Sequence, residues 1–69
     1  MKPDELRLLR ELQRRSAGGQ HVYVRALVDE LGIHPKRGAY ILDKWTGKGW
    51  YDYGVSVMAG WLTEKGRVQ

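Results

Sequence analysis

Apolar residues at helical spacing dominate the first stretch of the chain. They fall on one stripe of a helix, with Leu6, Leu9 and Leu12 in line and Leu8 beside them. Pro3 suits a first helical turn, where its missing N–H group is not needed, and the acidic residues after it complement the helix dipole. Segment 16–19, which contains two glycines, ends the pattern. We therefore predict a first helix that begins near Pro3 and ends at this segment.

Two further helical patterns follow, and only a few residues around Gly32 separate them. The first of the two begins at Arg25, and its inward residues are Ala26, Leu27 and Leu31, with Val28 between them. The second covers residues 35–45, with Ala39, Leu42 and Trp45 inward, Ile41 flanking them and Gly38 on the same side. A glycine inside a helix is unfavourable by up to about 1 kcal/mol relative to alanine, so Gly38 indicates a place where two helices cross closely. Two helices at this spacing are typical of a helix-turn-helix.

Extended segments complete the pattern of elements. The candidate strands are His21–Val24, Trp50–Tyr53 and Ser56–Leu62, with Gly54-Val55 joining the last two into a hairpin. Thr63–Gly66 can begin another helical turn. The predicted order is helix, short strand, helix, turn, helix and hairpin, within a single domain over residues 1–69.

The composition restricts the chemistry that the chain can carry. It has no cysteine and two histidines far apart in the sequence, so we expect no disulfide, no metal site and no cofactor. Neither a nucleophile–base set nor a glycine-rich phosphate loop is evident, so we expect a protein that is not an enzyme and has no small-molecule ligand. Stability must come from packing, to which Trp45, Trp50 and Trp61 are expected to contribute. The charged N-terminal segment and the lack of a long apolar run predict a cytoplasmic protein without a membrane segment.

Basic residues exceed acidic ones, and much of the excess lies in one region. The chain has 12 Lys and Arg against 8 Asp and Glu, a formal net charge of +4. Residues 34–50 alone hold four bases and one acid, a difference of +3. This local excess permits an anionic partner such as nucleic acid.

Three segments, taken together and in order, resemble the winged-helix family of bacterial and phage DNA-binding proteins. They are ALVDELGIHPKRGAYILDKW at residues 26–45, GKGWY at residues 47–51 and WLTEKGR at residues 61–67. The resemblance implies an α+β winged helix-turn-helix fold, with three helices, a short strand and a C-terminal β-hairpin wing. It also implies binding of double-stranded DNA through the recognition helix, residues 35–45, in a small transcriptional regulator.

The outward face of this recognition helix supplies the expected DNA contacts. With its apolar line turned inward, the exposed side chains are Lys36, Arg37, Tyr40, Asp43 and Lys44. Arg37 is the first choice for a base contact, because a guanidinium pairs bidentately with guanine O6 and N7. Tyr40 would reach a base or a phosphate, and His34 would cap the helix, contact a phosphate or face solvent. The residues that suit phosphates are Lys36, Lys44 and Lys48.

Several of these features have a second interpretation. The arginines of the first helix form a phosphate-facing edge or, as we favour, a solubilising face that pairs with Glu11. The wing tip, residues 53–56, has no Lys or Arg, which favours the main alternative of a winged helix that binds protein instead of DNA. An RNA-binding winged helix is the third interpretation. Because a chain of this size offers limited area, specific DNA binding is expected to need a homodimer or a protein partner.

Overall fold

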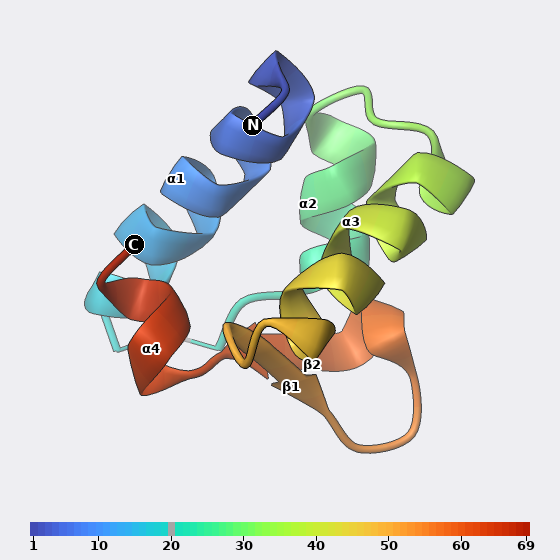
Figure 1. Cartoon of the computed structure of the whole chain (residues 1–69). Coiled ribbons are helices and arrows are strands. Elements are labelled where there is room, and N and C mark those ends of the chain that lie inside the picture. Colours follow the sequence, from blue (N-terminus) through green and yellow to red (C-terminus); the bar gives the residue numbers. More distant parts are fainter. Residues whose placement is uncertain (20) are drawn as a thin grey trace.

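The computed structural model describes residues 1–19 and 21–69, in which three helices are followed by a β-hairpin (Figure 1). The elements are α1 (Pro3–Ala17), α2 (Val24–Glu30), α3 (Pro35–Gly47), β1 (Tyr51–Tyr53), the 3₁₀ turn η1 (Val57–Ala59), β2 (Gly60–Leu62) and α4 (Glu64–Arg67). The two strands form one antiparallel sheet. This α+β arrangement has a winged-helix-like topology and confirms the predicted fold class.

Helix α1 buries a row of side chains that differs from the predicted stripe at one position. Leu8, Leu9 and Leu12 are in the core, as expected, but Leu6 is 42% exposed. The buried row instead begins at Glu5, so that its members follow the i, i+3, i+4, i+7 spacing of one helix face. The prediction for Leu6 was wrong because a repeated interval of three residues drifts off one face of a helix with 3.6 residues per turn.

Helices α2 and α3 pack closely, and Gly38 lies at their crossing. A Cβ atom at this position would come within 2.7 Å of Val28 Cγ1, closer than real Cβ atoms approach another carbon. The glycine therefore lets α3 lie against α2, as the sequence predicts. Gly32, with φ of 72°, makes the turn between the two helices in a backbone conformation that favours glycine.

Helix α2 begins one residue earlier than predicted, and the short strand expected at His21–Val24 is not formed. Val24 is buried in the first turn of α2, whereas Ala26, which was expected to point inward, is exposed. Residues 21–23 donate no backbone hydrogen bond to the sheet, so they form no ladder with β1 or β2. The strand prediction was wrong because β propensity depends on a partner strand within reach.

Helix α3 begins at a histidine cap. His34 Nδ1 accepts a hydrogen bond from the Lys36 backbone N–H at 3.1 Å, so of the three roles considered for His34 the structure shows the cap. The buried residues of the helix are Gly38, Ile41, Leu42 and Trp45. Ala39 lies at the edge of this face and is half-buried, which corrects its predicted inward position. The helix continues slightly beyond its predicted end, to Gly47.

The hairpin is shorter than the sequence predicts. Its register pairs Tyr51 with Leu62, Asp52 with Trp61 and Tyr53 with Gly60. The strand expected over Ser56–Leu62 is extended only at its end, because Val57–Ala59 form a 3₁₀ turn. The buried Tyr51 hydroxyl holds this turn in place: it donates to the Val57 carbonyl at 2.7 Å and accepts from the Gly60 N–H at 2.9 Å.

The three tryptophans expected in the core lie at different depths. Trp45 is fully buried, Trp50 is partly buried and Trp61 is 50% exposed. Trp61 lies between two buried residues of β2, so the alternation of a strand turns its side chain to the opposite face. The prediction for Trp61 was therefore wrong, and the sheet presents an exposed aromatic side chain on that face.

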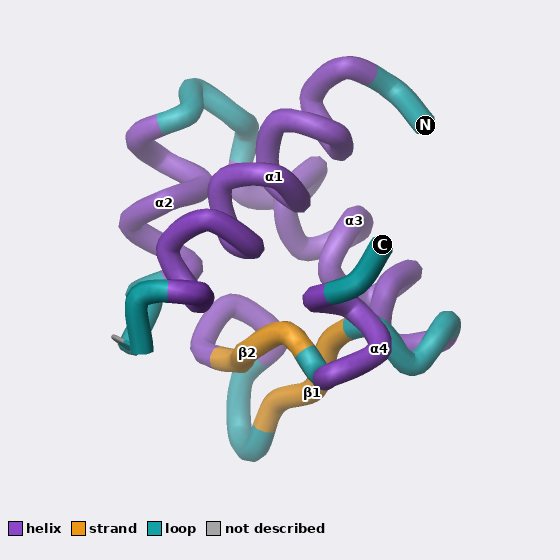
Figure 2. Tube along the Cα trace, turned by 90° about the vertical axis from the view of Figure 1, so that its left-hand side faces the viewer, coloured by secondary structure: helices purple, strands orange, loops and turns teal. Residues whose placement is uncertain are grey.

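Helix α4 packs beside α1 (Figures 1 and 2) and confirms the extra helical turn that the sequence suggests after the hairpin. Thr63 caps it, because its Oγ1 accepts from the Gly66 N–H at 3.1 Å. The Thr63 backbone N–H also donates to the Trp50 carbonyl at 2.9 Å, which ties the start of α4 to β1. Across residues 1–19 and 21–69, no helix combines the length and the apolar character that crossing a membrane requires.

Candidate nucleic-acid interface

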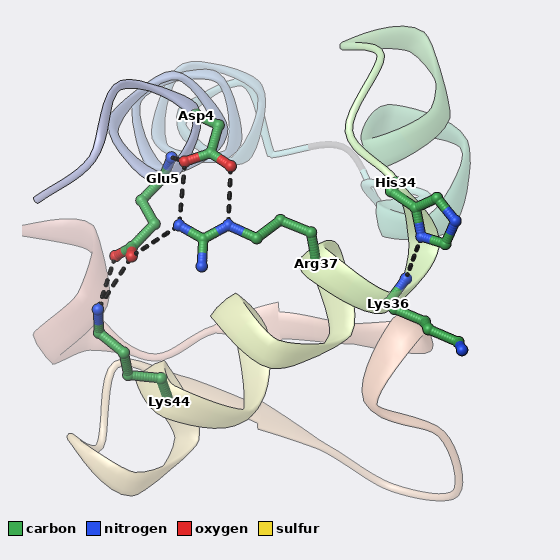
Figure 3. A network of polar contacts seen from close by, with 6 residues as sticks. All are labelled: Asp4, Glu5, His34, Lys36, Arg37 and Lys44. Atoms are coloured by element: carbon green, nitrogen blue, oxygen red, sulfur yellow. Dashed lines mark hydrogen bonds and ion pairs between the residues drawn. The ribbon is translucent and has the colours of Figure 1, made fainter.

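Three residues predicted to face outward on α3 do so. Lys36, Tyr40 and Asp43 are exposed and follow one another at intervals of four and three residues, opposite the buried face of the helix. Figure 3 shows the Lys36 side chain pointing away from α1. Within the described part of the chain, the Lys36 and Asp43 side chains form no ion pair or hydrogen bond. We call these three residues the outward row.

Arg37 and Lys44, by contrast, turn toward α1 (Figure 3). Arg37 Nε donates to Asp4 Oδ2 at 2.8 Å, and Arg37 Nη2 donates to Asp4 Oδ1 at 3.1 Å. The same Nη2 donates to Glu5 Oε1 at 3.3 Å. Lys44 Nζ donates to both carboxylate oxygens of Glu5, at 2.9 and 3.0 Å. We call these four residues the α1–α3 ion network.

The positions of these residues on their helices bring the network together. Arg37 and Lys44 are nearly two helical turns apart on α3, so they lie on the same edge of that helix. Glu5 belongs to the buried row of α1, and its side chain is only 3% exposed. A buried carboxylate is unfavourable unless cations or hydrogen-bond donors surround it. The two cations of α3 satisfy this requirement for Glu5.

Hydrogen bonds from arginines lower the pKa of two carboxyl groups in α1. The Arg37 guanidinium lowers the pKa of Asp4 from its ordinary 3.8 to about 2, and the same pairing raises the pKa of Arg37. Arg14 and Arg15 donate to Glu11 and lower its pKa from 4.5 to about 2. Both carboxylates therefore remain charged except under strongly acidic conditions.

We expect these pairs to make the protein less stable in acid. A carboxyl group with a lower pKa in the folded state stabilises that state above its unfolded pKa, and the contribution disappears as the pH falls through the folded pKa. For Asp4 and Glu11 the loss is expected as the pH falls from about 4.5 to about 2. The measurement is the thermal unfolding midpoint against pH for the native protein and Asp4→Asn. The variant should decline less steeply; equal declines would contradict the contribution of Asp4.

Two other predicted contact residues lie in cation–aromatic pairs. The Lys48 ammonium lies 4.6 Å from the centroid of the Trp50 ring, and the Arg37 guanidinium lies 5.5 Å from that of Tyr40. Lys48 and Tyr40 are themselves exposed. Contacts of this kind at exposed sites are weak, so they orient both side chains without withdrawing them from solvent.

The arginines near the end of α1 are paired with carboxylates. Arg14 and Arg15 both contact Glu11, and Arg15 also contacts Glu30 on α2. The sequence predicts that Glu11 pairs with both Arg7 and Arg15. The pair with Arg15 forms, whereas Arg7 donates to a backbone carbonyl at the end of α2 instead. These contacts favour the interpretation of this surface as a solubilising and packing face.

A hollow of about 520 Å³ lies between α2, the start of α3 and η1. Tyr23, Ala26, Pro35 and Met58 contribute to its wall, and Tyr23 is largely exposed. The hollow is thus a mainly apolar depression next to the start of α3. Among the residues that the structure describes, no three His, Asp or Glu side chains come together in a group that could hold a metal ion.

Asp4 and Glu5 are the members of this site that the sequence analysis missed. Glu5 carries one signal in the sequence, because it begins the spacing that places Leu8, Leu9 and Leu12 on a single helix face. A carboxylate at the start of such a row needs a cationic partner. The partner cannot be deduced from the spacing, since the bonds to Lys44 and Arg37 join residues 39 and 32 positions apart.

Comparison of the chain with protein-family models, with curated proteins and with solved structures gives no match. The winged-helix-like topology therefore rests on the order of the elements and on the register of the hairpin.

Proposed function

We propose that the protein binds double-stranded DNA by placing α3 in the major groove. The outward row carries this proposal, because it presents three exposed polar side chains on a helix that the core holds from behind. The helix from Lys36 to Asp43 rises about 10 Å, close to the height of three stacked base pairs. An α-helix fits the major groove of B-DNA, where base edges present distinct hydrogen-bonding patterns.

The exposed groups of α3 suit different parts of the groove. Lys36 and Lys48, at opposite ends of the helix, are suited to phosphates. Tyr40 lies between them and can contact a base edge or a phosphate. Arg37 can pair with guanine, as the sequence suggests, once its guanidinium leaves Asp4.

In this proposal the protein acts as a small transcriptional regulator. A single module buries roughly 600–1,000 Å² of protein surface on specific DNA. The wing tip, residues 53–56, adds no basic side chain to the surface of α3. Two copies on a site with two-fold symmetry would supply a second α3, and the larger contact area would support sequence-specific binding.

A salt titration against random-sequence duplex DNA tests the proposal. We expect binding that weakens steeply as salt increases, because Lys and Arg release counterions from phosphates. Lys36→Ala should weaken binding to all sequences and reduce the slope of log affinity against log salt by about 0.9. Arg67→Ala is the matched control, since it removes an exposed cation from α4 instead of α3. Equal losses for the two variants would contradict a role for the outward row.

The hollow beside α3 favours a second candidate function, a winged helix that binds another protein. The depression beside Tyr23, Ala26 and Met58 could receive an apolar side chain of a partner. Val55, at the uncharged wing tip, is fully exposed as well. If the folded protein binds no duplex DNA even at about 50 mM salt, where phosphate contacts are strong, this second function becomes the better explanation.

A further inference from the structure

Two cations of the α1–α3 ion network, Arg37 and Lys44, lie on the edge of α3, the helix that we propose to enter the major groove of DNA. We propose that Asp4 and Glu5 compete with DNA phosphates for Arg37 and Lys44, and thereby limit the affinity of the protein for DNA of any sequence. This inference rests on the proposed DNA binding. In this inference the first turn of α1 contributes to specificity, because it limits binding to DNA of any sequence. The side chains of α3 alone do not have this effect.

The geometry around Arg37 is the geometry with which arginine binds phosphate. Two of its nitrogen atoms meet the two oxygens of the Asp4 carboxylate, at 2.8 and 3.1 Å. Arginine uses the same planar pair of donors on carboxylates and on phosphates. Asp4 therefore occupies Nε and Nη2, one of the paired-donor edges that a DNA phosphate would use.

Both cations remain within reach of a partner. The side chains of Arg37 and Lys44 are 28% and 36% exposed. Arg37 also lies over the ring of Tyr40, which belongs to the outward row. Once released from the carboxylates, the two cations would lie along the edge of α3, beside the proposed contact face.

The network removes most of the positive charge that the sequence places on residues 34–50, which comprise α3 and the residues next to it. The four bases between residues 34 and 50 are offset there by one acid, which leaves a charge of +3. With Asp4 and Glu5 brought against the helix, three acids offset the same four bases and the local charge falls to +1. Binding to DNA of any sequence grows with the number of phosphates neutralised, so this pairing lowers it.

The two carboxylates differ in how readily they can be displaced. The Asp4 side chain is partly exposed and contacts a partly exposed cation, and ion pairs of this kind are weak enough to exchange with an external anion. Glu5 is buried, so a phosphate displaces it from Lys44 less readily than it displaces Asp4 from Arg37. Of the two carboxylates, Asp4 is therefore the one that an external anion displaces more readily. Removing the Asp4 carboxylate would release Arg37 from its paired contact.

The test is the affinity of Asp4→Asn for random-sequence duplex DNA, measured by fluorescence anisotropy at several salt concentrations. Asparagine offers one acceptor oxygen and no charge, so the paired contact of Arg37 is lost and only its longer bond to Glu5, at 3.3 Å, still competes with a phosphate. One additional phosphate contact steepens the slope of log affinity against log salt by about 0.9. The gain over the native protein should then be roughly 3.5-fold larger at about 50 mM than at about 200 mM salt.

Two controls separate release of Arg37 from a simple change of net charge. Glu11→Gln also removes one negative charge from α1 and frees arginines, but these lie away from α3. It should leave the slope nearly unchanged. In an Arg37→Gln background, Asp4→Asn should give no gain. Asp4→Ser, which keeps an acceptor for the first turn of α1, serves as a second variant if Asp4→Asn fails to fold.

Each outcome bears on one proposal or on both. If the native protein binds duplex DNA but Asp4→Asn has the same slope of log affinity against log salt, the competition by Asp4 is overturned and the proposed function is not. The competition would also be overturned if Glu11→Gln steepened the salt slope as much as Asp4→Asn does, or if Asp4→Asn still increased the affinity for DNA in the Arg37→Gln background. If neither the native protein nor any folded variant binds duplex DNA, both proposals are wrong.

Discussion

Gly66→Ala is expected to lower the free energy of unfolding by about 3 kcal/mol or more, because α4 has no room for a methyl group at this position. A Cβ atom there would lie 2.0 Å from the Trp50 carbonyl oxygen and 2.9 Å from its carbon. These are backbone atoms, and the same carbonyl accepts the Thr63 N–H, so neither side can shift without breaking the link between α4 and β1. A domain of this size has on the order of 5 kcal/mol of stability in total.

Thermal unfolding followed by circular dichroism measures this effect. We expect the midpoint of Gly66→Ala to fall by roughly 10–20 °C or the variant to be unfolded at room temperature. Gly47→Ala is the matched control, because a Cβ atom at Gly47 meets nothing within 4 Å and its backbone is helical. This variant should be as stable as the native protein, or more stable by up to about 1 kcal/mol. Similar losses for the two variants would refute the packing argument.

Tyr51→Phe is expected to destabilise the protein by about 1–3 kcal/mol, although the two side chains have nearly the same shape. The Tyr51 hydroxyl joins the first strand to η1 through its bonds to the Val57 carbonyl and the Gly60 N–H. Phenylalanine would leave the buried Gly60 N–H and the partly buried Val57 carbonyl without this partner. The hydroxyl is protonated at neutral pH and can donate, and burial raises its pKa further, from 10.0 to about 12.

The control for this substitution is Tyr53→Phe on the same strand. Tyr53 is half-buried, and its hydroxyl forms no hydrogen bond within the described part of the chain. Its replacement should change stability by less than about 0.5 kcal/mol. A urea titration of both variants distinguishes them, with a lower midpoint expected for Tyr51→Phe alone. Equal midpoints would show that the hydroxyl does not hold the turn.

The α1–α3 ion network also changes the expectation for Arg37 as a base reader. From the sequence, Arg37 is an exposed side chain free to pair with guanine. In the structure it is bound to Asp4 and contacts Glu5, so binding a base must first break these contacts. Its substitution would therefore affect stability and DNA affinity together, and the two must be measured on the same variants.

The three helices and the presence of a hairpin could be predicted from the sequence, because these features follow from local periodicity. Pro3 and Pro35 each begin a helix, and the buried leucines of α1 repeat at the spacing of a helix face. Gly38 could be placed at a helix crossing because its cost within a helix requires a compensating close contact. The outward position of Lys36, Tyr40 and Asp43 likewise follows from the position of the apolar line.

Which side chains meet across the fold depends on how the helices and strands pack, and it could not be predicted from the sequence. The partners of Asp4 and Glu5 lie more than 30 residues away, and spacing along the chain contains no information about such pairs. The missing strand at residues 21–23 has the same cause, since a strand exists only where a partner offers hydrogen bonds. Periodicity sets the direction in which a side chain points, whereas its partner depends on how whole elements pack. For this reason the sequence could predict the exposed row of α3 but not the acidic residues that neutralise its edge.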